Sequence, residues 1–166
     1  MSETHAIRCY EYVTAPYERV RDALRADTSG LFQKATKVAA ARAEKVVTGL
    51  KVHVGSLEVG TDVTITVRDL VEDASAPGIH GPRTRLMLEW QAAKAASLFP
   101  VMKAQLSVYP LSADETQLDF LGDYQPPGSV VGAAVDAIVG RRIAEATVHQ
   151  LVKDIAERLR EMTSKR

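Results

Sequence analysis

The sequence has few of the residues, and none of the short motifs, that mark familiar chemical sites. Cys9 is the only cysteine, so no internal disulfide can form and a metal site made of four cysteines is excluded. No two of the four histidines are close in sequence, and no His-Glu-x-x-His motif occurs. Walker, Gly-x-Gly-x-x-Gly and Gly-x-Ser-x-Gly patterns are also absent. The sequence therefore predicts no metal, no cofactor and no serine-hydrolase site.

The sequence also lacks an excess of charge of either sign. It has 21 Lys and Arg against 21 Asp and Glu, whereas a nucleic-acid-binding protein usually carries a basic excess. Residues 1–5 show neither the basic nor the apolar part of a signal peptide. The one long apolar run is interrupted by charged residues, namely Asp136, Arg141, Arg142, Glu145 and Lys153. We therefore expect no nucleic acid partner, no stable membrane insertion and a cytoplasmic location.

The apolar content, 46% of the residues, is sufficient for one domain that spans residues 1–166. Residues 6–14 combine aromatic and β-branched side chains, which predicts a strand. Pro16 suits the first turn of a short helix that ends near Asp27. A second helix is predicted from residue 31 to about residue 44.

Beyond these helices the apolar residues recur at every second position, which is typical of strands with one buried face. The alternation runs through residues 50–54, 63–67, 85–90, 102–108 and 117–124. Residues 72–82 give the longest loop signal, and we interpret them as an ordinary hairpin loop rather than a gate to a cavity. Because the connections are short, the strands are expected to form antiparallel hairpins.

The segment Tyr124-Gln-Pro-Pro-Gly-Ser129 separates the last strand from a long terminal helix. The two prolines and Gly128 prevent the strand from running into the helix, and Ser129 stands where an N-cap is expected. Residues 130–162 contain no proline and predict a helix of ~33 residues, about 50 Å long. The predicted fold class is therefore α+β, with a curved antiparallel sheet that holds a long C-terminal helix and two short helices after the first strand.

The first part of this helix, residues 130–139, is apolar on more than one side. A helix that is apolar all round is buried on all sides. Either the sheet and loops enclose this part completely, or it also packs against a second copy of the chain in a homodimer.

The order of these segments resembles the START/Bet v 1/polyketide-cyclase superfamily, also called SRPBCC. The resemblance rests on three stretches, namely Val13-Thr-Ala-Pro16 with Glu18, Val20 and Leu24; Leu98-Phe-Pro100 with Tyr109-Pro-Leu111; and Tyr124-Gln-Pro-Pro-Gly128 with Gly132 and Asp136. It extends to small bacterial members of unknown function. It implies a helix-grip fold with an apolar cavity, in which members bind lipids, sterols, hormones or polyketide intermediates and a minority catalyse cyclisation, dehydration or hydrolysis. It implies no catalytic residue, because the matching positions are structural.

Seven residues are candidates for contact with an apolar ligand in such a cavity: Phe32, Leu88, Trp90, Phe99, Met102, Phe120 and Tyr124. In this architecture the same sheet face forms both the cavity wall and the core. Each of these side chains therefore lines a cavity or fills the core, and Phe32, on the second short helix, is placed to cap the mouth.

The candidates for catalysis are Arg142, Glu145 and His149, which share one face of the terminal helix. Glu145 would orient His149 as a base, and Arg142 would hold an anionic ligand. The alternative is a salt-bridged stripe that faces solvent, because the main apolar stripe of the helix points to a neighbouring face. Cys9 lies in a predicted strand and is interpreted as a buried apolar residue rather than a reactive thiol.

Since no catalytic set is recognisable, the favoured function is binding or carriage of a small hydrophobic ligand that is lipid-, polyketide- or aromatic-like. The alternative is a cyclase or dehydratase acting in the same cavity, with Arg142, Glu145 and His149 or Tyr124 as acid/base groups. A further alternative is a homodimeric interaction module without a ligand.

Overall fold

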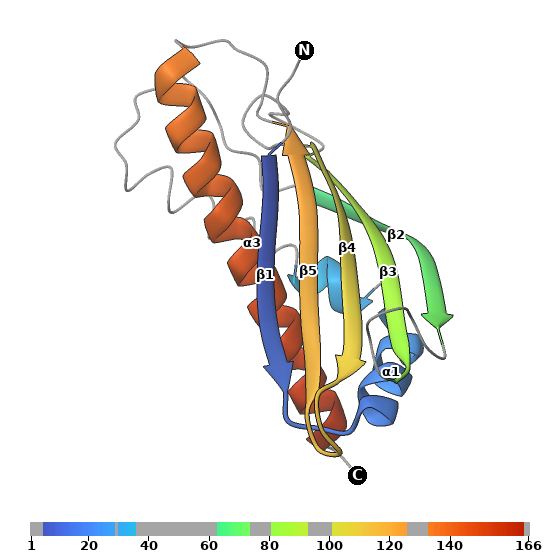
Figure 1. The fold of residues 1–166 in the computed structure, drawn as a ribbon. Helices are drawn as coiled ribbons and strands as arrows, with labels where there is room; N and C mark the ends of the chain where they lie inside the picture. The colour runs from blue at the N-terminus through green and yellow to red at the C-terminus, as the bar shows by residue number, and fades with distance from the viewer. Residues whose placement is uncertain are drawn as a thin grey trace.

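A computed structural model of the chain describes residues 5–28, 30–35, 63–73, 81–92, 101–125 and 133–164 (Figure 1). Its elements are β1 (His5–Val13), α1 (Tyr17–Ala26), β2 (Val63–Asp73), β3 (Arg83–Ala92), β4 (Val101–Pro110), β5 (Thr116–Gln125) and α3 (Ala133–Ser164). Residues 30–35 are also helical. The α+β class, with two short helices after the first strand and a long C-terminal helix, is confirmed.

The strands form one antiparallel sheet in the order β1-β5-β4-β3-β2. Three hairpin connections join β2 to β5 in sequence, as the short links predict, and β1 pairs with the last strand. The long helix α3 runs across one face and contacts β1, β5 and α1 (Figure 1). This is the helix-grip arrangement, and the face toward α3 is called the inner face below.

The core lies between the inner face and α3. The apolar stripe predicted on the terminal helix is buried throughout, namely Val148, Leu151, Val152, Ile155 and Leu159. Phe120 and Leu106, which oppose each other on β5 and β4, are also fully buried. Burial of such large apolar side chains is the main favourable term in folding, at about 1.5–3 kcal/mol for each.

One predicted element boundary is wrong. Glu72 and Asp73 were predicted to begin a loop, but they belong to β2, where they pair with Thr84 and Arg83 of β3. Arg85 also donates to Asp73 at 2.8 Å, so charge pairing extends this hairpin beyond the apolar alternation. The predicted strand 50–54, the second part of the helix 31–44 and the Pro-Pro-Gly junction lie outside the described residues.

Buried hydrogen bonds fix the chain where α1 meets the sheet. The hydroxyl groups of Tyr17 and Thr84 are 2.7 Å apart, and both residues are buried. The Thr116 hydroxyl donates to the carbonyl of Ala15 at 2.8 Å. Because these buried polar groups hydrogen-bond to one another, they have a structural role where α1 packs on the inner face.

The C-terminal part of α3 is joined to the edge strand β1. Arg160 Nη2 donates to the carbonyl oxygen of Tyr12 and lies 3.4 Å from a carboxylate oxygen of Glu11. The same carboxylate accepts from the backbone N–H of Tyr12 at 3.3 Å. Both backbone polar groups of Tyr12 therefore have side-chain partners.

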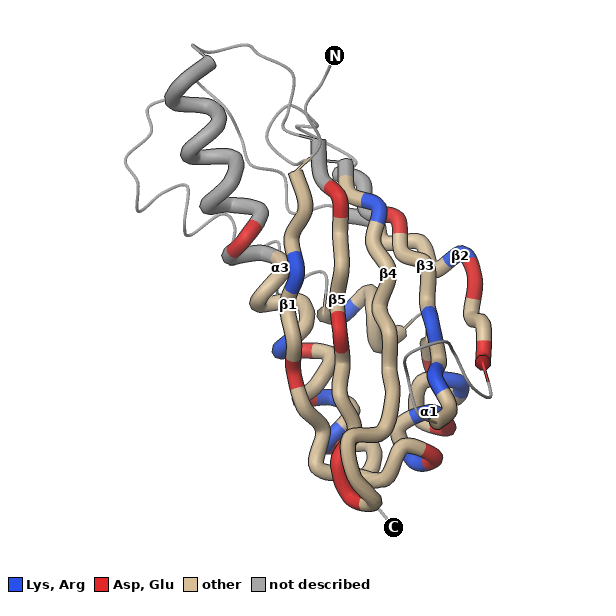
Figure 2. Tube along the Cα trace, in the orientation of Figure 1, with Lys and Arg blue, Asp and Glu red and all other residues tan. Residues whose placement is uncertain are grey.

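Charged residues of both signs are distributed along the strands and over α1 (Figure 2). On the outer face of the sheet, Arg8 makes a two-point contact with Asp119, at 3.3 and 3.0 Å. In the described part of the chain, no helix is both long and apolar enough to cross a membrane.

Candidate functional site

The strand register places two very small residues side by side in the middle of the inner face. Gly122 of β5 is paired with Ile7 on one side and with Ala104 of β4 on the other. Ala104 is in turn paired with Leu88, and Leu88 with Val67. Since large residues occupy the rows on either side, the Gly122–Ala104 pair makes a depression in the sheet.

An apolar recess lies over this depression. It is lined by Ile65, Leu88, Met102, Ala104, Phe120 and, from α3, Leu151. No part of the recess is wide enough to hold a water molecule. No charged or polar side chain is among these lining residues, so the recess suits only apolar groups.

Gly122 is needed for space rather than for backbone conformation. Its φ is not in the left-handed region; among the described glycines only Gly81 has a positive φ, 117°. A β-carbon on Gly122 would lie 2.9 Å from Cε1 of Phe120 and 3.1 Å from Sδ of Met102. These two side chains therefore lean over Gly122 and fill the space that its missing side chain leaves.

Three of the seven residues predicted to contact a ligand, Leu88, Met102 and Phe120, lie together in the lining. Phe32 is fully buried but is not part of the lining. Phe99 and the side chains of Trp90 and Tyr124 lie outside what the structure describes, although the register places Trp90 and Tyr124 on either side of Met102. All seven assignments remain predictions.

Sequence reasoning did not single out Ile65, Ala104, Leu151 or Gly122. The available signal was the presence of small residues at inward positions of β4 and β5, since a glycine or alanine inside a strand marks a close approach of something else. That signal becomes specific only when the register shows that Ala104 and Gly122 are neighbours.

The residues predicted to act as acid/base groups, His149 and Glu145, differ in their exposure to solvent. His149 is exposed, and its Nδ1 lies 3.3 Å from Sγ of Cys9 on β1. Glu145, one turn earlier, is half-buried, and the side chain of Arg142 lies outside the described set. Neither Glu145 nor His149 is among the described residues that line the recess, and the catalytic role of all three residues stays a prediction.

Cys9 itself is buried, as predicted, with 5% of its surface exposed. Burial raises the pKa of its thiol to about 11, and the nearby carboxylates of Glu11 and Asp119 act in the same direction. The thiol is therefore protonated at neutral pH, although His149 is within reach. A nucleophilic cysteine needs the opposite environment, one that favours the thiolate.

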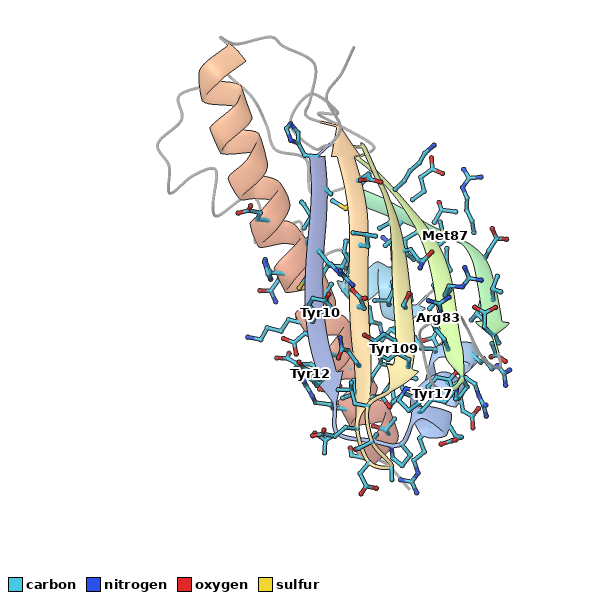
Figure 3. All side chains as sticks on the ribbon, in the orientation of Figure 1. Tyr10, Tyr12, Tyr17, Arg83, Met87 and Tyr109 are labelled. Carbon is cyan, nitrogen blue, oxygen red and sulfur yellow. The ribbon has the colours of Figure 1, made fainter. Side chains whose placement is uncertain are left out.

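The outer face of the sheet carries a group of aromatic residues. Tyr10 and Tyr12 on β1 are 43% and 51% exposed, and Tyr109 lies on β4 (Figure 3). The guanidinium of Arg8 lies 4.9 Å from the centre of the Tyr10 ring. Partial burial, followed by the Asp119 carboxylate, raises the pKa of Tyr109.

Comparison with known proteins gives likenesses of fold. No protein-family model matches the sequence, and no curated protein matches it. The structure is similar to TTHA0849 from Thermus thermophilus, with 15% identity, coverage of 93% of this chain and 97% of the other, and a TM-score of 0.44. Norcoclaurine synthase from Thalictrum flavum, solved with dopamine and hydroxybenzaldehyde, has 13% identity, coverage of 96% and 88%, and a TM-score of 0.44. The Zhui aromatase/cyclase from a Streptomyces species has 16% identity, coverage of 95% and 94%, and a TM-score of 0.43.

Each likeness concerns the course of the backbone and says nothing about what this chain binds.

Proposed function

We propose that the protein binds or carries a small, uncharged hydrophobic ligand in the recess between the inner face of the sheet and α3. The observation that carries the proposal is the depression at Gly122 and Ala104, around which all the described lining residues are apolar. The space above these two small residues is filled by the side chains of Phe120 and Met102, so it becomes available to a ligand when one of them withdraws. Ligand sites are typically apolar concavities of this kind.

The lining also supports a ligand class. A charged ligand would lose its hydration here without gaining a partner from the described part of the lining, which has no polar side chain. The ring of Phe120 and the thioether of Met102 favour contact with an aromatic or alicyclic ring. Lipid-like, polyketide-like and aromatic ligands therefore remain the candidates, in agreement with the function expected from the sequence.

The first test is to identify what the protein carries. Native mass spectrometry of the purified full chain, followed by solvent extraction, is expected to find a bound apolar molecule or an empty protein that takes up 1-naphthol. A protein that carries nothing and binds no uncharged aromatic probe would contradict the proposal.

A second test fills the recess. Ala104→Leu adds a branched side chain to the depression and is expected to weaken binding of 1-naphthol by at least about tenfold, since extra methylenes have no space there. Ala6→Leu is a matched control, because Ala6 is also a strand alanine but is exposed. Equal binding by wild type and both variants would place the ligand elsewhere.

A further inference from the structure

The recess is too narrow for any ligand as it stands, so some part of its lining must move when a ligand binds. The backbone below it is held in a continuous ladder between β4 and β5, which pairs every residue from Val101 to Pro110. A ladder of this kind resists local deformation. Movement of the lining on β4 and β5 must therefore come from side chains.

Met102 is the lining side chain best able to move. Its Sδ lies in the space over Gly122, 3.1 Å from where a β-carbon would be. Methionine is unbranched and has three rotatable bonds, so its end can leave this space without a change in the backbone. Leu88 and Ile65 are branched, and Ala104 has no rotatable side-chain bond of this kind.

Phe120 occupies the same space from the opposite direction. Its Cε1 is 2.9 Å from the position of a β-carbon on Gly122, so its ring and the Met102 thioether meet over the glycine. Phe120 is 1% exposed and is paired with Cys9 and Leu106, which limits the volume into which its ring can turn. The ring is therefore the fixed wall, and the thioether is the movable one.

We propose that Met102 is the residue that determines the size of ligand which the recess accepts. With its thioether over Gly122 the recess is closed, and withdrawal of the thioether exposes the Phe120 ring and the Gly122–Ala104 backbone to the ligand. The ligand class is an uncharged molecule with a flat ring system, which replaces the thioether against the ring of Phe120. This inference rests on the proposed function.

The test compares 1-naphthol, with two fused rings, and 1-aminoanthracene, with three, by fluorescence titration of the full chain. Met102→Ala removes the movable wall and is expected to improve binding of 1-aminoanthracene relative to 1-naphthol by about tenfold. Met87→Ala is the matched control, since Met87 is also a strand methionine but is 40% exposed and is not part of the lining. It is expected to leave the ratio of the two affinities close to that of the wild type.

If Met102→Ala leaves the ratio unchanged, or if Met87→Ala changes it equally, the assignment to Met102 is wrong while the proposed function stands. If wild type and both variants bind neither probe, the proposed function itself is wrong. Thermal unfolding of each variant shows whether it is folded.

Should Met102→Ala fail to fold, Met102→Leu replaces it. The leucine side chain has a similar volume but is branched, so we expect association of 1-aminoanthracene, measured by stopped-flow fluorescence, to slow by about tenfold. An unchanged association rate would overturn the assignment.

Discussion

The Sγ atom of Cys9 lies 3.3 Å from Nδ1 of His149, although the two residues are 140 positions apart in the sequence. The contact joins the first strand to the last helix on the inner face. A cysteine beside a histidine invites comparison with catalytic pairs. The raised pKa of the thiol indicates instead a buried, protonated sulfur that packs against α3.

We therefore expect Cys9 to be unreactive in the folded protein. With its pKa raised from 9.0 to about 11, the thiolate fraction near neutral pH falls about 100-fold. Alkylation by iodoacetamide, followed by mass spectrometry at about pH 8, is expected to be slower in the native protein than in urea by at least this factor. Comparable rates in the two states would show that His149 activates the thiol.

The same thiol makes stability depend on pH in the alkaline range. Above about pH 9 the unfolded chain releases the thiol proton, whereas the folded chain keeps it until about pH 11, so rising pH favours unfolding across this interval. The loss amounts to about 2.7 kcal/mol at most, once the pH exceeds the folded-state pKa of the thiol. Urea unfolding of wild type and Cys9→Ala is measured at about pH 8 and 10.5. The difference between the two proteins gives the contribution of the Cys9 thiol, since the other groups that titrate at alkaline pH are present in both. Parallel pH dependences in the two proteins would contradict this prediction.

The buried hydrogen bond between Tyr17 and Thr84 is expected to stabilise the attachment of α1 to the sheet. Tyr17→Phe leaves the Thr84 hydroxyl without its partner and is expected to lower the free energy of unfolding by about 1–2 kcal/mol. The double variant with Thr84→Val removes both hydroxyls, and its loss should be smaller than the sum of the two single losses. Additive losses in urea unfolding would show that the two hydroxyls do not interact.

The outer-face tyrosines offer a spectroscopic test of the electrostatics there. Asp119→Asn removes the carboxylate that helps to raise the pKa of Tyr109, so this pKa is expected to fall. Titration of tyrosine absorbance measures the change, and Tyr109→Phe identifies which transition belongs to Tyr109. An unchanged Tyr109 transition in Asp119→Asn would show that burial alone raises the pKa.

The sequence was sufficient for the fold because periodicity records which side of an element is buried. Leu86 and Leu88 alternate with exposed or half-buried neighbours in β3, and Val148, Leu151 and Leu159 repeat along one side of α3. The end of β2 was missed, since Glu72 and Asp73 interrupt the apolar pattern. Asp73 is paired with Arg83 and Arg85 on the other strand of the hairpin, and Glu72 is paired with Arg25 of α1.

The candidate site was only partly predictable, because its main features are relationships between strands. Alternation identified Leu88, Met102 and Phe120 as inward residues, but it did not show that Ala104 is next to Gly122. That neighbourhood depends on the register of the β4–β5 hairpin. The Cys9–His149 contact depends in turn on where α3 crosses β1, which no local pattern records.

The contacts of Arg160 with β1 have a consequence for how copies of the chain meet one another. An edge strand with free backbone groups can pair with an edge strand of another molecule. At Tyr12 the carbonyl is already bound by Arg160 and the N–H by Glu11, so a strand added at this end of β1 would first have to displace both. The end of α3 thus shields the edge of the sheet against the growth of intermolecular sheets at high protein concentration.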